Sequence, residues 1–172
     1  MSVSLPIEIL RKYKGNRNVF FETGTSDGDS AQTALDAGFS TVYTVELDYE
    51  TFRRAAIRFE DEPRISVIHG NSVSTLNFHL PVIREPVVFW LDAHPDWSSA
   101  ASPILEEIGV IRDHLFNDVI LADDMRLMGS GKWSRSSIQA ITDAVRAKSS
   151  EYKVTLEPNG HGPRDLFAAW RD

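Results

Sequence analysis

The chain has 172 residues, the usual size of one domain and enough to bury a sizeable core. Its formal net charge of −7 argues against broad, non-specific binding to nucleic acid or acidic membranes, which needs a basic face. It contains no cysteine, which excludes disulfides, cysteine-ligated zinc and thiol catalysis. The apolar runs are far shorter than the ~20 residues that span a bilayer, and the first 15 residues lack the order of a signal peptide. We therefore expect a cytoplasmic protein.

Strand-like and helix-like segments alternate along the chain, with no internal repeat or linker. Strands are expected where short apolar or β-branched runs occur, and helices where apolar residues recur at helical spacing. Up to the fourth strand the predicted elements are a helical segment in residues 1–16, strand Val19–Phe21, helix Ser30–Ala37 ended by Gly38, strand Thr41–Val45, helix Tyr49–Phe59, strand Ile65–Ile68, helix Ser72–Phe78 and the VVFWL strand after Pro86.

The remaining elements predict how the sheet closes. Ser102 and Pro103 form a helix start, with serine as N-cap and proline at the first helical position. The later predicted elements are this helix to about Leu115, strand Asp118–Ala122, helix Ser136–Lys148, and strands Tyr152–Leu156 and Leu166–Trp170 around the turn PNGHGP. That turn is too short for a crossover helix, so the last two strands are antiparallel.

This order predicts a single α/β domain over residues 1–172. Its fold class is Rossmann-like and doubly wound, with a mostly parallel seven-stranded sheet, an antiparallel last strand and helices on both faces. The carboxyl ends of parallel strands share one edge, where ligands bind. Polar residues follow all five of the first strands, at Glu22, at Glu46, at residues 69–72, at Asp92 to His94 and at Asp123-Asp124. We expect these strand ends to form one site.

The first of these strand ends is rich in glycine. Gly24 and Gly28 predict a turn whose backbone a ligand approaches closely and whose N–H groups are free. Glu46 follows a little over twenty residues later, where a carboxylate binds ribose hydroxyls in nucleotide-binding sheets. The pattern favours a nucleoside-containing ligand. The alternative is a tight turn that needs glycine for backbone reasons alone.

The acidic character of this turn bears on which nucleoside binds. A dinucleotide site has the pattern G-x-G-x-x-G, but counting from Gly24 the chain has Ser26 and Asp29 at the other two glycine positions. Asp29 and Glu22 would repel a pyrophosphate, whereas both suit a ligand with a cationic end. S-adenosylmethionine, with its ammonium, sulfonium and ribose, is such a ligand.

Five motifs, in order, carry a resemblance to a known family. They are ETGTSDGDS, VEL, HGNS, FWLDAH and ILADD, between Val19 and Arg126. The series resembles class I S-adenosylmethionine-dependent methyltransferases, in particular the small metal-dependent O-methyltransferases of the catechol and macrocin type. The resemblance implies that Glu22 and Gly24 bind the methionine end, Ser30 lies near its carboxylate, Glu46 holds the ribose, and Asn71 and Ser72 lie by the adenine. The full implied cofactor set is Glu22, Thr23, Gly24, Thr25, Ser26, Ser30, Glu46, Leu47, Asn71, Ser72 and Asp92.

The same resemblance implies a metal site at Asp92, Asp123 and Asp124. Three neighbouring carboxylates repel one another, and a hard divalent cation removes that conflict. Oxygen ligands suit Mg²⁺, with Mn²⁺ or Ca²⁺ as alternatives. Such a cation would lower the pKa of an acceptor hydroxyl. The alternative is that Asp123 and Asp124 cap the next loop, while Asp92 binds only the cofactor amine.

Asp92 and His94 are the candidate catalytic residues. His94 is either the general base or a packing residue, since the lysine that catechol-type enzymes place just beyond this region is absent here. The acceptor pocket is expected from the loops Pro95–Ser102 and Met125–Trp133. Their candidate side chains are Trp97, Met128 and Trp133 for a flat or sugar-like acceptor, and Arg126 for an acidic group or an ion pair with Asp123 or Asp124.

The function that these features favour is methyl transfer from S-adenosylmethionine to a small-molecule hydroxyl, with S-adenosylhomocysteine as product and Mg²⁺ as a possible aid. Two alternatives remain open: a non-catalytic nucleoside-binding module on the same fold, and an NAD-dependent oxidoreductase, which Ser26 and Asp29 disfavour. The acidic balance disfavours nucleic acid as the acceptor. No membrane partner is expected, and a homodimer is permitted.

Overall fold

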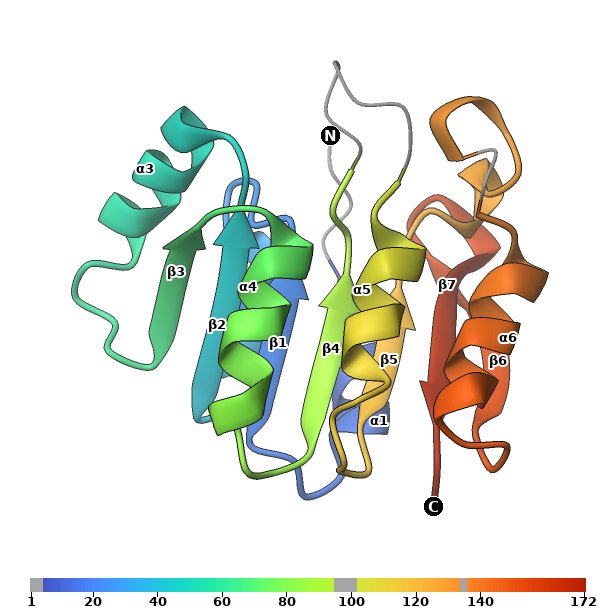
Figure 1. Cartoon of the computed structure of the whole chain (residues 1–172). Helices are drawn as coiled ribbons and strands as arrows, with labels where there is room; N and C mark the ends of the chain where they lie inside the picture. Colours follow the sequence, from blue (N-terminus) through green and yellow to red (C-terminus); the bar gives the residue numbers. More distant parts are fainter. Residues whose placement is uncertain (1–4, 95–101, 134–135) are drawn as a thin grey trace.

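A seven-stranded sheet forms the centre of the computed structural model, which describes residues 5–94, 102–133 and 136–172. The strand order is β3-β2-β1-β4-β5-β7-β6, and β7 runs in the direction opposite to the other strands (Figure 1). The strands are β1 Val19–Thr23, β2 Thr41–Glu46, β3 Ile65–His69, β4 Val87–Leu91, β5 Val119–Ala122, β6 Lys153–Asn159 and β7 Gly162–Trp170. The predicted fold class, including the antiparallel last strand, is confirmed.

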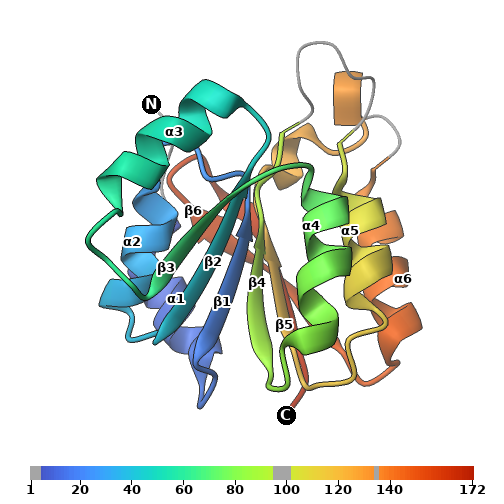
Figure 2. The ribbon, with the colours of Figure 1, turned by 60° about the vertical axis from the view of Figure 1, so that its left-hand side comes forward.

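Helices cover both faces of the sheet (Figure 2). They are α1 Ile7–Lys14, α2 Asp29–Asp36, α3 Tyr49–Arg58, α4 Ser72–His79, α5 Ile104–Ile111 and α6 Ile138–Lys148, with short 3-10 turns η1 Leu80–Val82, η2 Met125–Leu127 and η3 Gly131–Trp133. None of the helices within the described ranges combines the length and apolar character needed to cross a membrane.

Alternation along the central strands produces two separate cores. On β1, Val19 and Phe21 pack toward α4, α5 and α6, whereas Phe20 between them packs toward α1 and α2. Successive side chains of a strand point to opposite faces, so a strand buried on both faces is apolar throughout. The VVFWL sequence of β4 follows the same rule, with all five residues buried.

Several boundaries differ from those predicted. The C-terminal hairpin has a two-residue turn, because Asn159 pairs with Gly162 and most of PNGHGP belongs to the strands. The Asn159 side chain makes this possible by accepting from the N–H groups of His161 and Gly162. Helix α5 begins at Ile104 after Pro103 and ends at Ile111, before the predicted Leu115. Helix α6 begins at Ile138, two residues after the predicted Ser136, and Ser137 caps it by accepting from Ala140 N.

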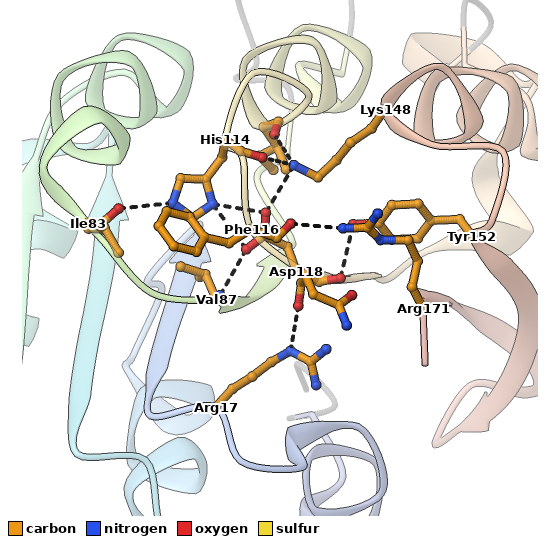
Figure 3. Close-up of polar contacts among 11 residues, drawn as sticks. Arg17, Ile83, Val87, His114, Phe116, Asp118, Lys148, Tyr152 and Arg171 are labelled. Atoms are coloured by element: carbon orange, nitrogen blue, oxygen red, sulfur yellow. Dashed lines mark hydrogen bonds and ion pairs between the residues drawn. The ribbon is translucent and has the colours of Figure 1, made fainter.

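A buried ionic cluster lies at the edge of the sheet where β4 and β5 begin (Figure 3). The fully buried Asp118 carboxylate contacts His114 Nδ1 at 2.9 Å and Lys148 Nζ at 3.1 Å. It also accepts from the backbone N–H of Val87 at 2.9 Å. Arg17 and Arg171 donate to the neighbouring carbonyls of Asn117 and Phe116. Asp118 precedes β5 and Asp123 follows it, so this cluster anchors the sheet at the edge opposite the candidate site.

Candidate active site

The turn after β1 is built by two glycines with positive φ. Gly24 has φ +87°, and a Cβ there would lie 2.6 Å from the carbonyl oxygen of Asp92. Gly28 has φ +84°, and its Cβ would lie 2.5 Å from the ring of Phe59. The N–H groups of Gly24 and Gly28 donate to Val45 O and Thr25 O. The prediction of free N–H groups is therefore wrong at both positions. The close approach of the Asp92 backbone explains Gly24, and the close approach of the Phe59 ring explains Gly28.

Glu22 is buried on the α2 side of this turn. Its Oε2 accepts from Thr44 Oγ1 at 2.6 Å, and that hydroxyl lies 2.6 Å from Thr25 Oγ1. Burial raises the pKa of Glu22 to about 8, although the hydroxyls of Thr44 and Ser30 lower it, and the charge of Asp92 raises it further. A ligand ammonium placed here would favour the ionised carboxylate. The site thus fits the cationic end of S-adenosylmethionine.

Glu46, at the end of β2, is held by two backbone groups. Its Oε2 accepts from Ser26 N at 3.0 Å, and its Oε1 accepts from Asp48 N at 2.9 Å. Ser26 makes this contact in a left-handed conformation with a φ of +49°, which is uncommon for a residue with a side chain. Each carboxylate oxygen has a further lone pair, so Glu46 can still accept from ribose hydroxyls. The adjacent Leu47 is half-exposed.

The start of α4 carries the residues predicted to lie by an adenine. Asn71 is exposed, and its Oδ1 caps the helix by accepting from Ser74 N at 3.1 Å. Ser72 is buried at the first position of α4. The amide oxygen of Asn71, which the sequence assigns to the adenine amino group, is therefore engaged in the helix cap.

His94 lies between two of the predicted metal ligands. Its Nε2 is 2.8 Å from Asp124 Oδ2 and 3.5 Å from Asp92 Oδ1. These carboxylates raise the pKa of His94 to about 10 in spite of its partial burial. Burial raises the pKa of Asp92, whereas His94 and Arg126 outweigh burial at Asp124 and lower its pKa. In this arrangement His94 holds a proton at neutral pH and balances the carboxylates.

Asp123 belongs to a second group, which includes residues from the C-terminal hairpin. Its Oδ1 accepts from Asn159 Nδ2 at 2.6 Å and from Asp124 N at 2.8 Å. Asp165 on β7 accepts from Asn159 Nδ2 at 3.1 Å and pairs with the Arg126 guanidinium. Burial raises the pKa of Asp123 to about 7. Sequence reasoning missed Asn159 and Asp165, because only the pairing of β7 with β5 brings them here.

These groups fit a divalent cation, with ligands that differ from the predicted set. Ligand atoms of Asp92, His94 and Asp124 lie within 4.8 Å of one another, and so do those of Asp123, Asp124 and Asp165. Asp124 is common to both, and the Arg126 guanidinium lies 2.7 Å from its Oδ1. Carboxylate oxygens suit Mg²⁺ or Mn²⁺, while an imidazole nitrogen extends the choice toward softer metals. Four carboxylates face Arg126 and His94 here, and His94 would have to lose its proton to become a ligand.

A small cleft opens beside these groups. Its described lining includes Met128 and Trp133, two of the predicted acceptor residues, and the Trp133 ring stands edge-on to His94 at 5.8 Å. Trp97 lies outside the described residues. The lining also includes Glu107, a buried acid on α5 that sequence reasoning missed because it falls inside an ordinary helix pattern. The cleft therefore joins the cofactor and metal candidates to the candidate acceptor side.

Comparisons with known proteins agree with this geometry at the level of the fold. No family model matches the chain, and no curated protein matches its sequence. Many solved structures match its fold. An O-methyltransferase from Bacillus cereus in complex with SAH aligns at a TM-score of 0.68 and 15% identity, covering 96% of this chain and 78% of the other. The O-methyltransferase TomG from Streptomyces achromogenes, in complex with SAM, aligns at 0.66 and 16%, covering 96% and 77%.

A third match shows how widely the fold is used. A structure from Clostridium thermocellum, provisionally described as an rRNA methylase, aligns at a TM-score of 0.67 and 8% identity, covering 96% of this chain and 95% of the other. The resemblance to class I S-adenosylmethionine-dependent methyltransferases is thus confirmed for the fold. The acceptor has to be argued from the site.

Proposed function

We propose that this chain transfers a methyl group from S-adenosylmethionine to a hydroxyl of a small-molecule acceptor, assisted by a divalent cation. The observation that carries the proposal is the pair of acidic residues at the ends of the adjacent strands β1 and β2. Glu22 is a buried carboxyl whose pKa of about 8 calls for a cationic partner, and Glu46 is fixed at the sheet edge by two backbone N–H groups. The SAM and SAH complexes of the fold's relatives support the same cofactor.

The protein's part in such a reaction is alignment. S-adenosylmethionine supplies an activated methyl group when bound, so the side chains need to orient rather than activate it. Glu22 binds the ammonium, and Glu46 accepts from the ribose hydroxyls. Asp92, which follows β4 and borders the cleft, stands between the cofactor end and the acceptor end of the site. Met128 and Trp133 then exclude water from the acceptor side.

Asp92, Asp124 and His94 would hold the cation, with Asp123 reaching it only by releasing Asn159. A bound cation lowers the pKa of an acceptor hydroxyl and orients it. As a ligand, His94 would use the Nε2 lone pair that a general base needs, so it would take only one of the two roles. Its base role, which requires loss of the proton that Asp92 and Asp124 now stabilise, applies where the aspartates hold the cation without it. The small acceptor and the cytoplasmic location stay predictions from the sequence.

The alternatives differ in the ligand that they require. A binding module on the same fold would bind the nucleoside without turnover. An oxidoreductase would bind NAD⁺, and one argument against it weakens here, because Arg58 pairs with Asp29 at 2.7 Å. Two arguments remain: Ser26 stands at the second glycine position of the dinucleotide pattern, and the buried carboxyl of Glu22 would face a pyrophosphate.

Calorimetric titration tests the proposal directly. S-adenosylhomocysteine and NAD⁺ are titrated separately into the full chain, each with and without Mg²⁺ or Mn²⁺. Micromolar binding of S-adenosylhomocysteine alone supports the cofactor, and an additional cation-dependent heat supports the metal. Failure of S-adenosylhomocysteine to bind under every condition contradicts the methyltransferase function.

A further inference from the structure

Glu107 is an acid buried in the first turn of α5, and no described Lys, Arg or His forms an ion pair with it. The residue is 1% exposed, and its Oε1 has no hydrogen-bond partner among the described residues. Burial raises the pKa of Glu107 to about 7, although the nearby hydroxyls of Ser72 and Thr23 lower it. A buried carboxyl oxygen without a partner costs stability. The adjacent Glu106 is exposed, so the helix could present an acid to solvent without this cost.

The surroundings of Glu107 connect it to the cofactor end of the site. Thr23 ends β1, and Ser72 begins α4, which packs beside α5 (Figure 2). Thr23 Oγ1 likewise has no partner within the described part of the chain. Glu107 also lines the cleft together with Asp92 and Ala93. An unpartnered carboxyl oxygen therefore lies where β1, β4 and the start of α4 meet.

The hydrogen-bond donors of the cofactor can be matched with the acidic groups of the site. S-adenosylmethionine carries an ammonium, two ribose hydroxyls and the 6-amino group of adenine. Glu22 suits the ammonium and Glu46 the ribose, each on its own strand end. The Asn71 amide oxygen caps α4 and keeps one lone pair, but Asn71 is exposed, so it is not a buried acceptor for the 6-amino group. Glu107 is the buried acid that remains on the α4 side.

We propose that Glu107 binds the 6-amino group of adenine and makes the site select adenine over hypoxanthine. The inference rests on the proposed S-adenosylmethionine function and adds a specificity residue to it. The Oε1 atom of the ionised carboxylate accepts the amino N–H, and the nearby hydroxyls of Ser72 and Thr23 favour that ionised form. A 6-oxo group in the same position would put two acceptors face to face.

Two probes that differ only in this group test the proposal: S-adenosylhomocysteine and S-inosylhomocysteine. Calorimetry with the native chain near pH 8.5, where Glu107 is ionised, is expected to give about 10- to 100-fold weaker binding of the inosyl compound. In Glu107→Gln the amide presents either its oxygen or its NH₂ to the base, so the ratio is expected to fall below about threefold. Glu106→Gln removes the same charge one residue away and is expected to keep the native ratio.

Each outcome has one interpretation. Equal binding of the two probes by the native chain, or a native ratio retained by Glu107→Gln, overturns the role of Glu107 while leaving the methyltransferase function intact. Failure of S-adenosylhomocysteine to bind the native chain overturns the proposed function itself. Glu107→Gln removes a buried acid without changing size and is expected to fold. If Glu107→Gln fails to fold, Glu107→Met is used instead, and its ratio of the two affinities is again expected to fall below about threefold. A native ratio in Glu107→Met overturns the proposal.

Discussion

The hydroxyl of Thr44 on β2 donates a 2.6 Å hydrogen bond to the buried carboxylate of Glu22 on β1. The bond crosses between adjacent parallel strands, since Glu22 and Thr44 are partners in the β1–β2 register. Thr25 continues the chain of hydroxyls at 2.6 Å from Thr44. These two hydroxyls satisfy one oxygen of Glu22 but supply no positive charge. The buried carboxylate therefore has no opposite charge from them, and a bound ligand cation would provide one.

Glu22→Gln is therefore expected to change how stability depends on pH. The pKa of Glu22 is raised from its ordinary 4.5 to about 8, so the folded state binds more protons than the unfolded state between these values. Native stability then falls as pH rises through this window, and the glutamine variant loses that slope. Urea unfolding is expected to show little difference near pH 5, and an advantage for the variant on the order of 3 kcal/mol near pH 9. The exposed Glu60→Gln should retain the native slope, and an identical slope in Glu22→Gln would contradict the assignment.

Gly24→Ala is expected to destabilise the turn by about 2–4 kcal/mol, because the new Cβ meets the Asp92 backbone in addition to the left-handed φ. Gly129 has a φ of +84° with no atom within 4 Å of a Cβ, so Gly129→Ala measures the φ cost alone, about 1–2 kcal/mol. Chemical denaturation of both variants measures how much more unfolding free energy Gly24→Ala loses than Gly129→Ala. Equal losses would show that the approach of β4 is not what requires glycine at position 24.

Asp118→Asn is expected to cost about 3–5 kcal/mol of unfolding free energy, because it leaves the buried Lys148 ammonium without its carboxylate. The exposed Asp113→Asn is the control and should change stability little. Since Asp118 lies at the opposite end of β5 from the site, folded Asp118→Asn should bind S-adenosylhomocysteine as the native chain does. A selective loss of binding with unchanged stability would refute this structural role.

Asp124→Asn is expected to weaken Mn²⁺ binding by at least about tenfold, because Asp124 belongs to both groups of candidate ligands. Asp123→Asn should have a smaller effect, since Asp123 is hydrogen-bonded to Asn159. Calorimetry with Mn²⁺ alone measures both, with Asp113→Asn as the matched surface control. Larger losses in Asp123→Asn would instead favour the ligand set predicted from the sequence.

Much of the fold could be predicted because the central strands are apolar on both faces and short turns separate them from helices. Glu22, Glu46 and Asp92 could be placed at one edge for the same reason, since parallel strands align their carboxyl ends. The full set of residues around the candidate metal site could not be predicted in this way. The partners of Asp123 come from the last hairpin, and no local pattern shows that β7, rather than β6, pairs with β5.

The glycines and Glu107 show a second limit of what can be predicted from the sequence. A glycine after a strand indicates close approach, but the sequence does not show whether the approaching atom belongs to a ligand or to β4. Glu106 and Glu107 are identical in type and adjacent, yet only one is buried. Which one faces α4 depends on where α5 begins, and the structure starts this helix at Ile104.

The placement of β7 between β5 and β6 also bears on the order of folding. β6 precedes β7 along the chain but lies farther from β5, so adding the strands singly would require β7 to enter an occupied gap. The two-residue turn lets β6 and β7 form a hairpin locally, on the microsecond scale, and then dock as one unit. Pulsed hydrogen exchange during refolding should protect both strands together. Asp165 then reaches Asp123 only at the docking step, so binding competence should develop in parallel with that protection.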